Sequence, residues 1–307
     1  MQEINNSIGM GWLPDYPDFQ DYTDQKDIIS PKLVRLGQTD TVKAMINKIG
    51  ISNFPEAFDF TRPVDLRRWC SPIENQGSLG SCTAHAGIGI VEYFEKRAFG
   101  KYIDASRRFL YKVTRNLMRV TGDTGAYLRT TMGAMVLFGV PPEEYWDYSI
   151  PNFDIEPSPF CYSFAQNFQT IQYVRLDPLN ISREALLIKI KKYLVAGLPS
   201  MFGFSVYPSI EQANTTGKIP FPCRGEGGPI GGHAIDAIGF NDKLEIKNSN
   251  CDNPTKGAFL IRNSWGSSWG DGGYGWLPYE YVLNGLAVDW WTLLKNEWVD
   301  TNKFKVN

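Results

Sequence analysis

Residues 54–307 change in character part-way along, because helical candidates come first and strand-like runs follow. Three stretches are helical candidates that each end near a glycine, 82–99, 127–138 and 183–195, and in the first of them apolar residues recur at helical spacing. After Pro199 come MFGFSVY, HAIDAIGF and AFLIRNSW, which are rich in β-branched and aromatic residues. A last helical spacing, at Trp290, Leu294 and Trp298, is typical of packing. This order predicts an α+β protein whose first part is mainly helical and whose second part is mainly β.

Length and charge narrow the class further. A chain of 307 residues exceeds the usual size of one hydrophobic core, so two lobes with a cleft between them are expected. Its apolar content of 43% is far from a disordered composition. The net charge of -2 comes from mixed acids and bases, which gives no basic stripe for nucleic acid and no polybasic membrane anchor. We predict an ordered monomer that binds neither nucleic acid nor membrane.

The N-terminus has no basic stretch followed by an apolar one, and no apolar run is long enough to span a membrane. The sequence as it stands therefore predicts a soluble protein without a signal peptide. A cytoplasmic location is the default expectation. A secreted, lysosomal-type or virion location, or a chain from which a leader was removed, stays open.

Residues 1–53 differ from the rest of the chain. They open with a stretch rich in Pro, Asp and Tyr and contain one short helical candidate, from Thr41 to Ile49. Nothing there has the apolar content of a core of its own. We place a functional boundary near residue 53, with a helical lobe at 54–165 and a β lobe with a C-terminal tail at 166–307.

The five cysteines are too few for a disulfide framework in a chain this long, and their odd number predicts at least one free thiol. Apart from Cys82, the cysteines at 70, 161, 223 and 251 allow three pairings, among which the sequence does not choose. Reduced cysteines would favour a cytosolic setting and bridged ones an oxidising setting. With two distant histidines and scattered cysteines, neither a metal site nor another cofactor is indicated.

Cys82 follows a Gly-Ser turn at the predicted start of the helix 82–99. Unpaired amides at a helix N-terminus favour an anion, so we expect a thiolate with a lowered pKa. Gln76, six residues earlier, has a side-chain amide that could point at a carbonyl oxygen together with the backbone N–H of Cys82, as in an oxyanion hole. Taken alone, a buried structural cysteine and an ordinary loop glutamine are equally good interpretations.

Only two imidazoles exist, His85 and His233. His85 lies three residues after Cys82 on the same predicted helix, whereas His233 begins a predicted strand in GGHAIDAIGF. Asn263, in IRNSWGSSWGDGGYGW, could orient a histidine through a hydrogen bond that the tryptophans shield from water. Taken singly, the histidine is more often structural, and the Gly/Trp run is more often a packed loop.

Together, Q-x5-C, GGHA and RNSWGxxWG occur in one specific order, and the chain resembles the papain/cathepsin family of cysteine peptidases over roughly residues 54–285. The motif LGSCTA resembles its prokaryotic and viral branch in particular. The resemblance implies a helical lobe, an antiparallel β-barrel lobe and an active-site cleft between them, with peptide-bond hydrolysis through an acyl-enzyme. It assigns Cys82 as nucleophile, His233 as base, Asn263 as its orienter, Gln76 as oxyanion donor and Trp265 as the shielding indole.

The chain also departs from the family pattern. Leu79 and Thr83 stand where the family usually has a cysteine and a tryptophan, so the disulfide made by that cysteine is absent. Asn263 lies 30 residues after His233, which predicts a longer polar hairpin outside the barrel. Neither departure removes a group that the mechanism needs.

The resemblance extends to substrate binding and to the N-terminus. GDTGAYLR at 122–129 resembles the segment that pairs with an extended peptide, so Thr124 and Gly125 are expected to bind substrate, together with Gly232 and Trp265. GWLPDYPDFQDY resembles the opening of prokaryotic members, which implies an inhibitory propeptide within residues 1–53 and synthesis as a zymogen. Permanent packing of this segment on the lobes is the alternative.

Other functions for the same constellation are a Cys/His/Asn amidase or transferase, and a catalytically silent protein that binds peptides. The joint motif argues against the first, and the intact set of four candidate residues argues against the second. Carboxydipeptidase activity in this family relies on a histidine-bearing loop, for which only His85 is spare. The sequence therefore favours an endopeptidase, or failing that an aminopeptidase, acting on peptides or proteins.

Overall fold

The computed structural model describes residues 9–19, 21–24, 29, 34, 39–54 and 59–296. Its helices of four residues or more are α2 (Val42–Ile49), α3 (Cys82–Phe99), α4 (Arg107–Met118), α5 (Leu128–Leu137), α6 (Pro159–Ala165), α7 (Arg183–Val195) and α8 (Glu280–Leu283). The strands are β1 (Val64–Asp65), β2 (Thr170–Arg175), β3 (Ser200–Val206), β4 (Gly231–Ile246), β5 (Thr255–Arg262), β6 (Tyr274–Pro278) and β7 (Ala287–Asn296). The expected helices at 82–99, 127–138 and 183–195 are confirmed as α3, α5 and α7.

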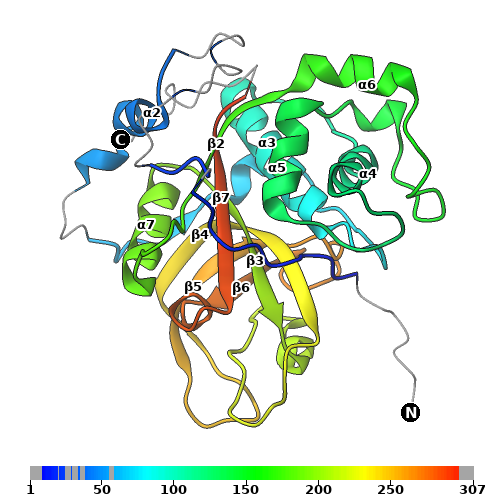
Figure 1. Ribbon diagram of the computed structural model, residues 1–307. Coiled ribbons are helices and arrows are strands. Elements are labelled where there is room, and N and C mark those ends of the chain that lie inside the picture. Colours follow the sequence, from blue (N-terminus) through cyan, green and yellow to red (C-terminus); the bar gives the residue numbers. More distant parts are fainter. Residues whose placement is uncertain are drawn as a thin grey trace.

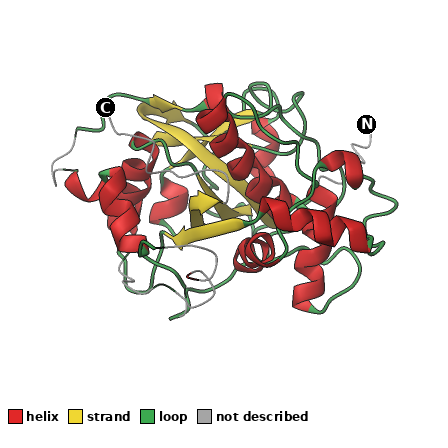
Figure 2. Ribbon diagram, turned by 90° about the horizontal axis from the view of Figure 1, so that it is seen from above, coloured by secondary structure: helices red, strands yellow, loops and turns green. Residues whose placement is uncertain are grey.

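The α+β architecture with helices and sheet in separate regions is confirmed. Helices α3, α4, α5 and α6 gather on one side of the molecule, with the strands β3 to β6 below them (Figure 1). Seen from above, the strands lie between two groups of helices, the second of which contains α2 and α7 (Figure 2). Within the described residues, no helix is both long and apolar enough to cross a membrane.

The sheet is antiparallel, with the strand order β2-β7-β3-β4-β5-β6 and β1 added beside β4. Strands β3 and β4 pair in register from Ser200 opposite Ala237 to Val206 opposite Gly231. The word barrel applies only loosely, because β2 and β6 end the path and no pairing between these two edges is described. Long antiparallel pairing nevertheless holds the start of β4 in a fixed position.

The helical spacing near the C-terminus was misleading, since this stretch is strand β7. Trp290 and Leu294 lie within the strand, and Trp298 lies outside the described residues. Strand β7 pairs with both β2 and β3, and Trp290 stacks on Phe202 with ring centroids 3.9 Å apart. Sheet pairing and aromatic packing decide the conformation here, because they outweigh a short apolar periodicity.

Helix α4, which the sequence analysis did not predict, begins at a local capping signal. The hydroxyl of Ser106 accepts a hydrogen bond from the backbone N–H of Phe109 at 3.2 Å. The basic side chains of this helix are buried in ion pairs; Arg107 contacts Glu92 of α3 at 2.9 Å. A pattern of apolar residues alone does not reveal such a helix, because its buried face is partly charged.

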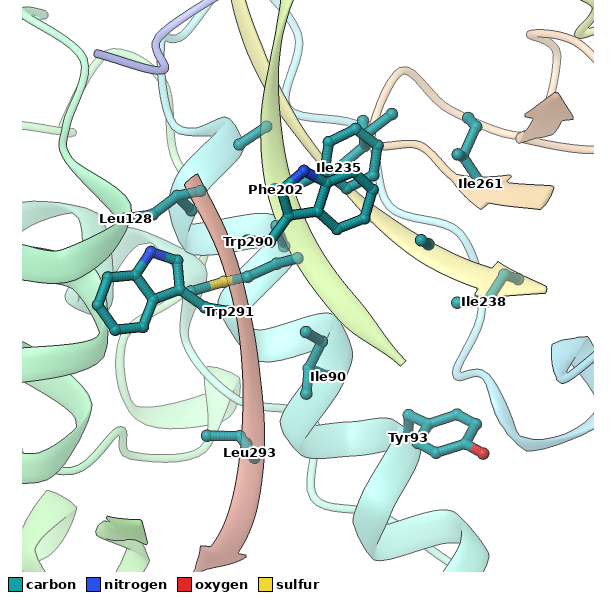
Figure 3. Packing of buried hydrophobic residues seen from close by; sticks show 14 of the residues in the cluster. Ile90, Tyr93, Leu128, Phe202, Ile235, Ile238, Ile261, Trp290, Trp291 and Leu293 are labelled. Carbon is teal, nitrogen blue, oxygen red and sulfur yellow. The ribbon is translucent and has the colours of Figure 1, made fainter. Parts of the chain in front are cut away.

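Helix α3 is the centre of the molecule. Every residue from Cys82 to Ile90 is buried, and the helix packs against β4, β3 and β7. Figure 3 shows Ile90 of this helix among buried side chains of the sheet and of α5, including Phe202, Trp290, Leu293 and Leu128. Because interiors are close-packed, the first turn of α3 is held rigidly against the sheet.

The cysteines resolve the open question of pairing. Cys223 and Cys251 form a disulfide that joins the segment before β4 to the long β4–β5 hairpin. Cys70, Cys82 and Cys161 are free thiols. The predicted free thiol is therefore confirmed. Of the two disulfides in the arrangement 223–251 with 70–161, only the first is formed.

Candidate active site

The first residue of α3 is Cys82, which follows the N-cap Ser81. Its side chain is fully buried. The backbone N–H of Ala234, at the start of β4, donates a hydrogen bond to the sulfur at 3.4 Å. Packing of α3 against β4 therefore brings a cysteine and the residue after His233 into direct contact across 152 residues of sequence.

His233 is oriented from two sides. Its Nε2 lies 2.8 Å from Oδ1 of Asn263, an acceptor, so Nε2 carries the proton. The indole of Trp265 stacks on the imidazole with centroids 4.5 Å apart and planes inclined by 20°. The other ring nitrogen, Nδ1, is buried and has no hydrogen-bond partner. This arrangement fixes the tautomer and leaves an unprotonated nitrogen free for a proton.

The pKa values of Cys82 and His233 make both side chains uncharged at neutral pH. Burial raises the pKa of the Cys82 thiol to about 11, although N–H groups of Ala234 and Gly11 at the sulfur lower it. Burial lowers the pKa of His233 to about 4, against the opposing effect of Asn263. The expected lowering of the thiol pKa is wrong for this state, because loss of water outweighs the helix N-terminus.

The side-chain amide of Gln76 is held at both ends. Its Oε1 accepts a hydrogen bond from the hydroxyl of Ser264 at 2.6 Å. Its Nε2 donates to the carbonyls of Leu79, at 2.8 Å, and Gly9, at 3.0 Å. The orientation of the amide is therefore fixed, and one of its two N–H donors is taken by a carbonyl of the N-terminal segment.

Residues 9–13 of that segment run between the helical part and the sheet, where the dark blue trace crosses the molecule (Figure 1). On the helical side, the carbonyl of Gly11 accepts from Ala126 N–H at 2.7 Å, and Leu13 N–H donates to the Ala126 carbonyl at 3.0 Å. On the sheet side, Trp12 N–H donates to the Gly232 carbonyl at 3.1 Å. The segment thus binds both sides of the site through its main chain, directly over Cys82.

The four residues expected to bind substrate have different surroundings. Gly232 contacts the segment, and Gly125, with φ of 73°, lets it approach, since a Cβ there would lie 2.3 Å from the Gly11 carbonyl. Trp265 covers His233, whereas the Thr124 hydroxyl bonds the Gly125 carbonyl. The residue that pairs with the segment is Ala126, which the sequence analysis missed because main-chain pairing leaves no side-chain signal.

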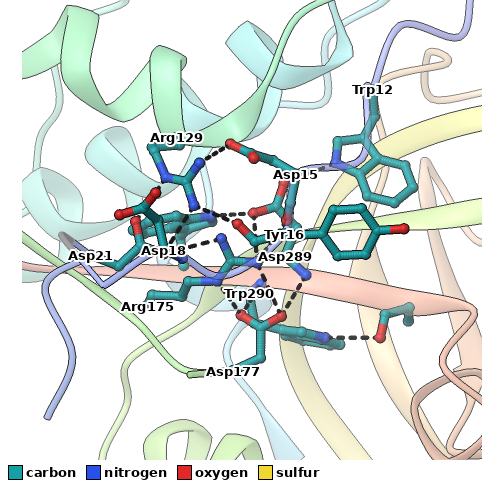
Figure 4. Close-up of polar contacts among 12 residues, drawn as sticks. Trp12, Asp15, Tyr16, Asp18, Asp21, Arg129, Arg175, Asp177, Asp289 and Trp290 are labelled. Carbon is teal, nitrogen blue, oxygen red and sulfur yellow. Dashed lines mark hydrogen bonds and ion pairs between the residues drawn. The ribbon is translucent and has the colours of Figure 1, made fainter. Parts of the chain in front are cut away.

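Beyond residue 13 the segment is anchored by ion pairs, drawn in Figure 4. Arg129 of α5 contacts the carboxylates of Asp15 and Asp21 and donates to the carbonyl of Tyr16. Arg175 of β2 lies 3.3 Å from Asp21. We call these contacts of Arg129 and Arg175 with residues 15–21 the anchor. The sequence could not reveal it, because the partners lie more than 100 residues apart.

A further polar chain connects the turn before Cys82 with the residues around Ala126, where the N-terminal segment pairs. The carboxylate of Asp123 accepts from Gly80 N–H at 3.0 Å and from the Tyr111 hydroxyl at 2.5 Å. The same hydroxyl accepts from Gly125 N–H at 3.0 Å. Asp123 therefore ties the turn before Cys82 to the edge that holds the N-terminal segment.

His85 stands apart from this arrangement. Its Nδ1 lies 3.1 Å from the Ser81 carbonyl, and its ring packs edge-on against Tyr148. Burial, followed by the charge of Arg107, lowers its pKa to about 3. The described residues contain no group of three or more metal-ligating side chains placed to hold an ion.

Comparison with known proteins agrees with the geometry. The family model described as papain family cysteine protease matches residues 54–284. An uncharacterised peptidase C1-like protein of Acanthamoeba polyphaga mimivirus is 31% identical over 94% of this chain and 87% of its own length. The crystal structure of xylellain, a cysteine protease from Xylella fastidiosa, superposes with a TM-score of 0.68 and 27% identity over 95% of this chain and 98% of its own. The ragweed pollen cysteine protease Amb a 11 in its proform shares the fold, with a TM-score of 0.57 and 21% identity over 80% of this chain and 70% of its own. By matched motif, sequence and fold, the chain belongs to the papain family of cysteine proteases.

Proposed function

We propose that this protein is an endopeptidase that cuts peptide bonds through a thioester on Cys82, and that residues 1–53 keep it inactive as a zymogen. One observation supports the catalytic part. Asn263 orients His233 through its Nε2, and the next residue, Ala234, donates a hydrogen bond to the sulfur of Cys82. The division into a helical lobe at 54–165 and a β lobe at 166–307 belongs to the same proposal, since each lobe supplies part of the site.

The chemistry follows from the free nitrogen of His233. Nδ1 takes the thiol proton of Cys82, and the sulfur attacks the substrate carbonyl carbon. Nε2 of Gln76 and the backbone N–H of Cys82 donate to the oxygen that becomes negative. When the C–N bond breaks, His233 returns the proton to the leaving amine. Water, deprotonated by His233, then attacks the thioester, releasing the acid and the free thiol.

Asn263 acts through the histidine. When His233 gains a proton it carries a positive charge, and the carbonyl oxygen of Asn263 stabilises it while holding the ring in place. Trp265 keeps water away from this hydrogen bond. An extended peptide substrate would take over the main-chain bonds that Ala126 and Gly232 now make with the segment.

The zymogen part rests on what the segment occupies. The Gly9 carbonyl uses a donor of Gln76, and Gly11 lies at the sulfur. A peptide substrate needs both places, so the segment and a substrate exclude one another. The pollen protease with the same fold was solved in its proform, which supports a removable segment here.

The test is hydrolysis of an unfolded protein substrate by the purified chain, before and after limited proteolysis of the N-terminal segment. We expect hydrolysis after proteolysis, and its loss in Cys82→Ala. Wild-type turnover by the Cys82→Ala variant would refute the assignment of the nucleophile. Equal activity before and after loss of the segment would refute the zymogen.

A further inference from the structure

The side chain of Trp12 leaves the segment and fills a buried slot in the sheet lobe. Only 6% of this tryptophan is exposed. Two glycines form the walls of the slot, because a Cβ on Gly203 would lie 1.8 Å from Cε2 of the indole, and one on Gly232 would lie 2.9 Å from Cε3. All three atoms nearest to the Gly203 position belong to Trp12. Because Gly203 of β3 has no side chain, the space beside it is free for a flat ring, and the indole of Trp12 occupies it.

A carboxylate closes the inner end of the slot. Oδ2 of Asp289, a fully buried residue, accepts a hydrogen bond from the indole Nε1 of Trp12 at 3.1 Å. Oδ1 accepts from Nε1 of Trp291 at 2.7 Å and lies 3.4 Å from the guanidinium of Arg175. Oδ2 is thus the oxygen that the slot presents to whatever enters it.

The backbone of Asp289 is held in an unusual conformation. Its φ is 63°, which costs free energy in a residue other than glycine. Asp177 holds it there, since its carboxylate accepts from the N–H groups of Asp289, at 2.8 Å, and Trp290, at 2.9 Å. Asp177 therefore stabilises the strained backbone of Asp289, and Asp289 is the residue that accepts the hydrogen bond from the Trp12 indole.

We propose that this slot is a substrate side-chain pocket that selects a flat aromatic ring carrying an N–H donor, and that Gly203 and Asp289 are its specificity-determining residues. The proposal rests on the peptidase function proposed above. Gly11 lies at the sulfur, so the pocket receives a residue adjacent to the one whose carbonyl is attacked. Trp12 occupies the pocket in the present state and shows what it accepts.

Competing side chains fit less well for stated reasons. Phenylalanine would fill the slot but leave Oδ2 of Asp289 buried without its donor, which is unfavourable. A lysine or arginine would meet a carboxylate whose charge Arg175 already offsets. A small side chain would leave the space opposite Gly203 empty.

The experiment uses the chain after limited proteolysis of the N-terminal segment, because the main chain of residues 9–13 otherwise covers the site and Trp12 fills the pocket. Its substrates are quenched fluorescent peptides that differ only at the two residues flanking the one that supplies the attacked carbonyl. We expect tryptophan at one of these positions to give a kcat/KM at least about tenfold above phenylalanine or lysine. Phenylalanine or lysine cleaved as fast as tryptophan would overturn the proposal.

Two variants of the same chain test whether Asp289 and Gly203 determine the selection of the side chain. Asp289→Asn should bring the tryptophan-to-phenylalanine ratio down toward one, and Gly203→Ala should slow both aromatic peptides relative to an alanine peptide. Gly133→Ala is the matched control, since nothing lies within 4 Å of its added Cβ. An undiminished tryptophan-to-phenylalanine ratio in Asp289→Asn, together with an undiminished aromatic-to-alanine ratio in Gly203→Ala, would overturn the assignment.

A binding measurement distinguishes an error in the proposed peptidase function from an error in the proposed pocket. A Cys82→Ala chain treated with the same protease cannot cut, so the affinities of the tryptophan and phenylalanine peptides are measured on it by fluorescence polarisation. At least about tenfold tighter binding of the tryptophan peptide supports the pocket even if the chain without its segment hydrolyses no peptide. Equal affinities overturn it even if hydrolysis is observed.

Discussion

Replacing Arg129 by methionine should open the site in the uncut chain. Arg129 contacts two carboxylates, Asp15 and Asp21, and one carbonyl, Tyr16, all of the N-terminal segment. Its side chain is 29% exposed, so solvent weakens these contacts without removing them. Charged hydrogen bonds contribute about 1.5–3 kcal/mol each when well formed, and after discounting for exposure we expect a loss of about 2–4 kcal/mol in docking.

A loss of that size changes the fraction of open molecules by roughly 30- to 700-fold, at about 1.4 kcal/mol for each factor of ten. The assay is the second-order rate at which an epoxysuccinyl peptide inhibitor inactivates the uncut chain. If only open molecules react, the rate rises by the same factor, up to the rate of the chain without its segment.

Arg67→Met is the matched control. Arg67 also pairs with two carboxylates, Asp65 and Asp271, but neither belongs to the segment. Its variant should react at the wild-type rate, and both variants should keep a melting temperature that rules out general unfolding. An unchanged rate in Arg129→Met, or an equal rise in Arg67→Met, would refute the anchor as the element that holds the site closed.

Further outcomes follow from the geometry. His85→Ala should change kcat/KM by less than about threefold, because its nitrogen serves a backbone carbonyl, whereas His233→Ala should lower it by at least about a hundredfold; the reverse result would mean that the base is misassigned. In the chain after proteolysis of the segment, Asp123→Ala loses the tie at Gly80 and should lower the rate of inactivation by the extended peptide inhibitor several-fold, while iodoacetamide still reacts with Cys82; an equal effect on both reagents would contradict a positioning role. Because the raised thiol pKa keeps Cys82 neutral below about 11, alkylation of the uncut chain by iodoacetamide should rise with pH only well above neutrality, and a plateau by pH 8 would contradict this.

The residues that meet around Cys82 could be named from the sequence because the informative motifs are local, and their catalytic roles stay a proposal. Cys82 follows its own turn, and the glycines and tryptophans around His233 and Asn263 stand next to them in sequence. Closure of the fold then brings these three residues together, and β4 contributes the direct contact through Ala234. Order along the chain and residue type indicated which residues to look for, whereas the distances between them come from the structure.

The remaining features depend on contacts that no local pattern carries. Trp12 and Asp289 meet across 277 residues, and a main-chain bond to Ala126 leaves no trace in side-chain identity. The thiol pKa was predicted in the wrong direction because burial of the sulfur, which no local pattern reveals, outweighs the helix start. Sheet pairing in β7 overrode an apparent helical spacing at Trp290 for the same kind of reason.

Mass spectrometry of the chain after reaction with an epoxysuccinyl peptide inhibitor, with peptide mapping of the adduct, shows whether Cys82 is the reactive thiol and whether the N-terminal segment covers it. It is run on the uncut chain, on Arg129→Met and on the chain after proteolysis of the segment. We expect a single adduct on Cys82 that forms readily only in the last two. Modification of Cys70 or Cys161 in its place, or no adduct on any of the three folded forms, would contradict it.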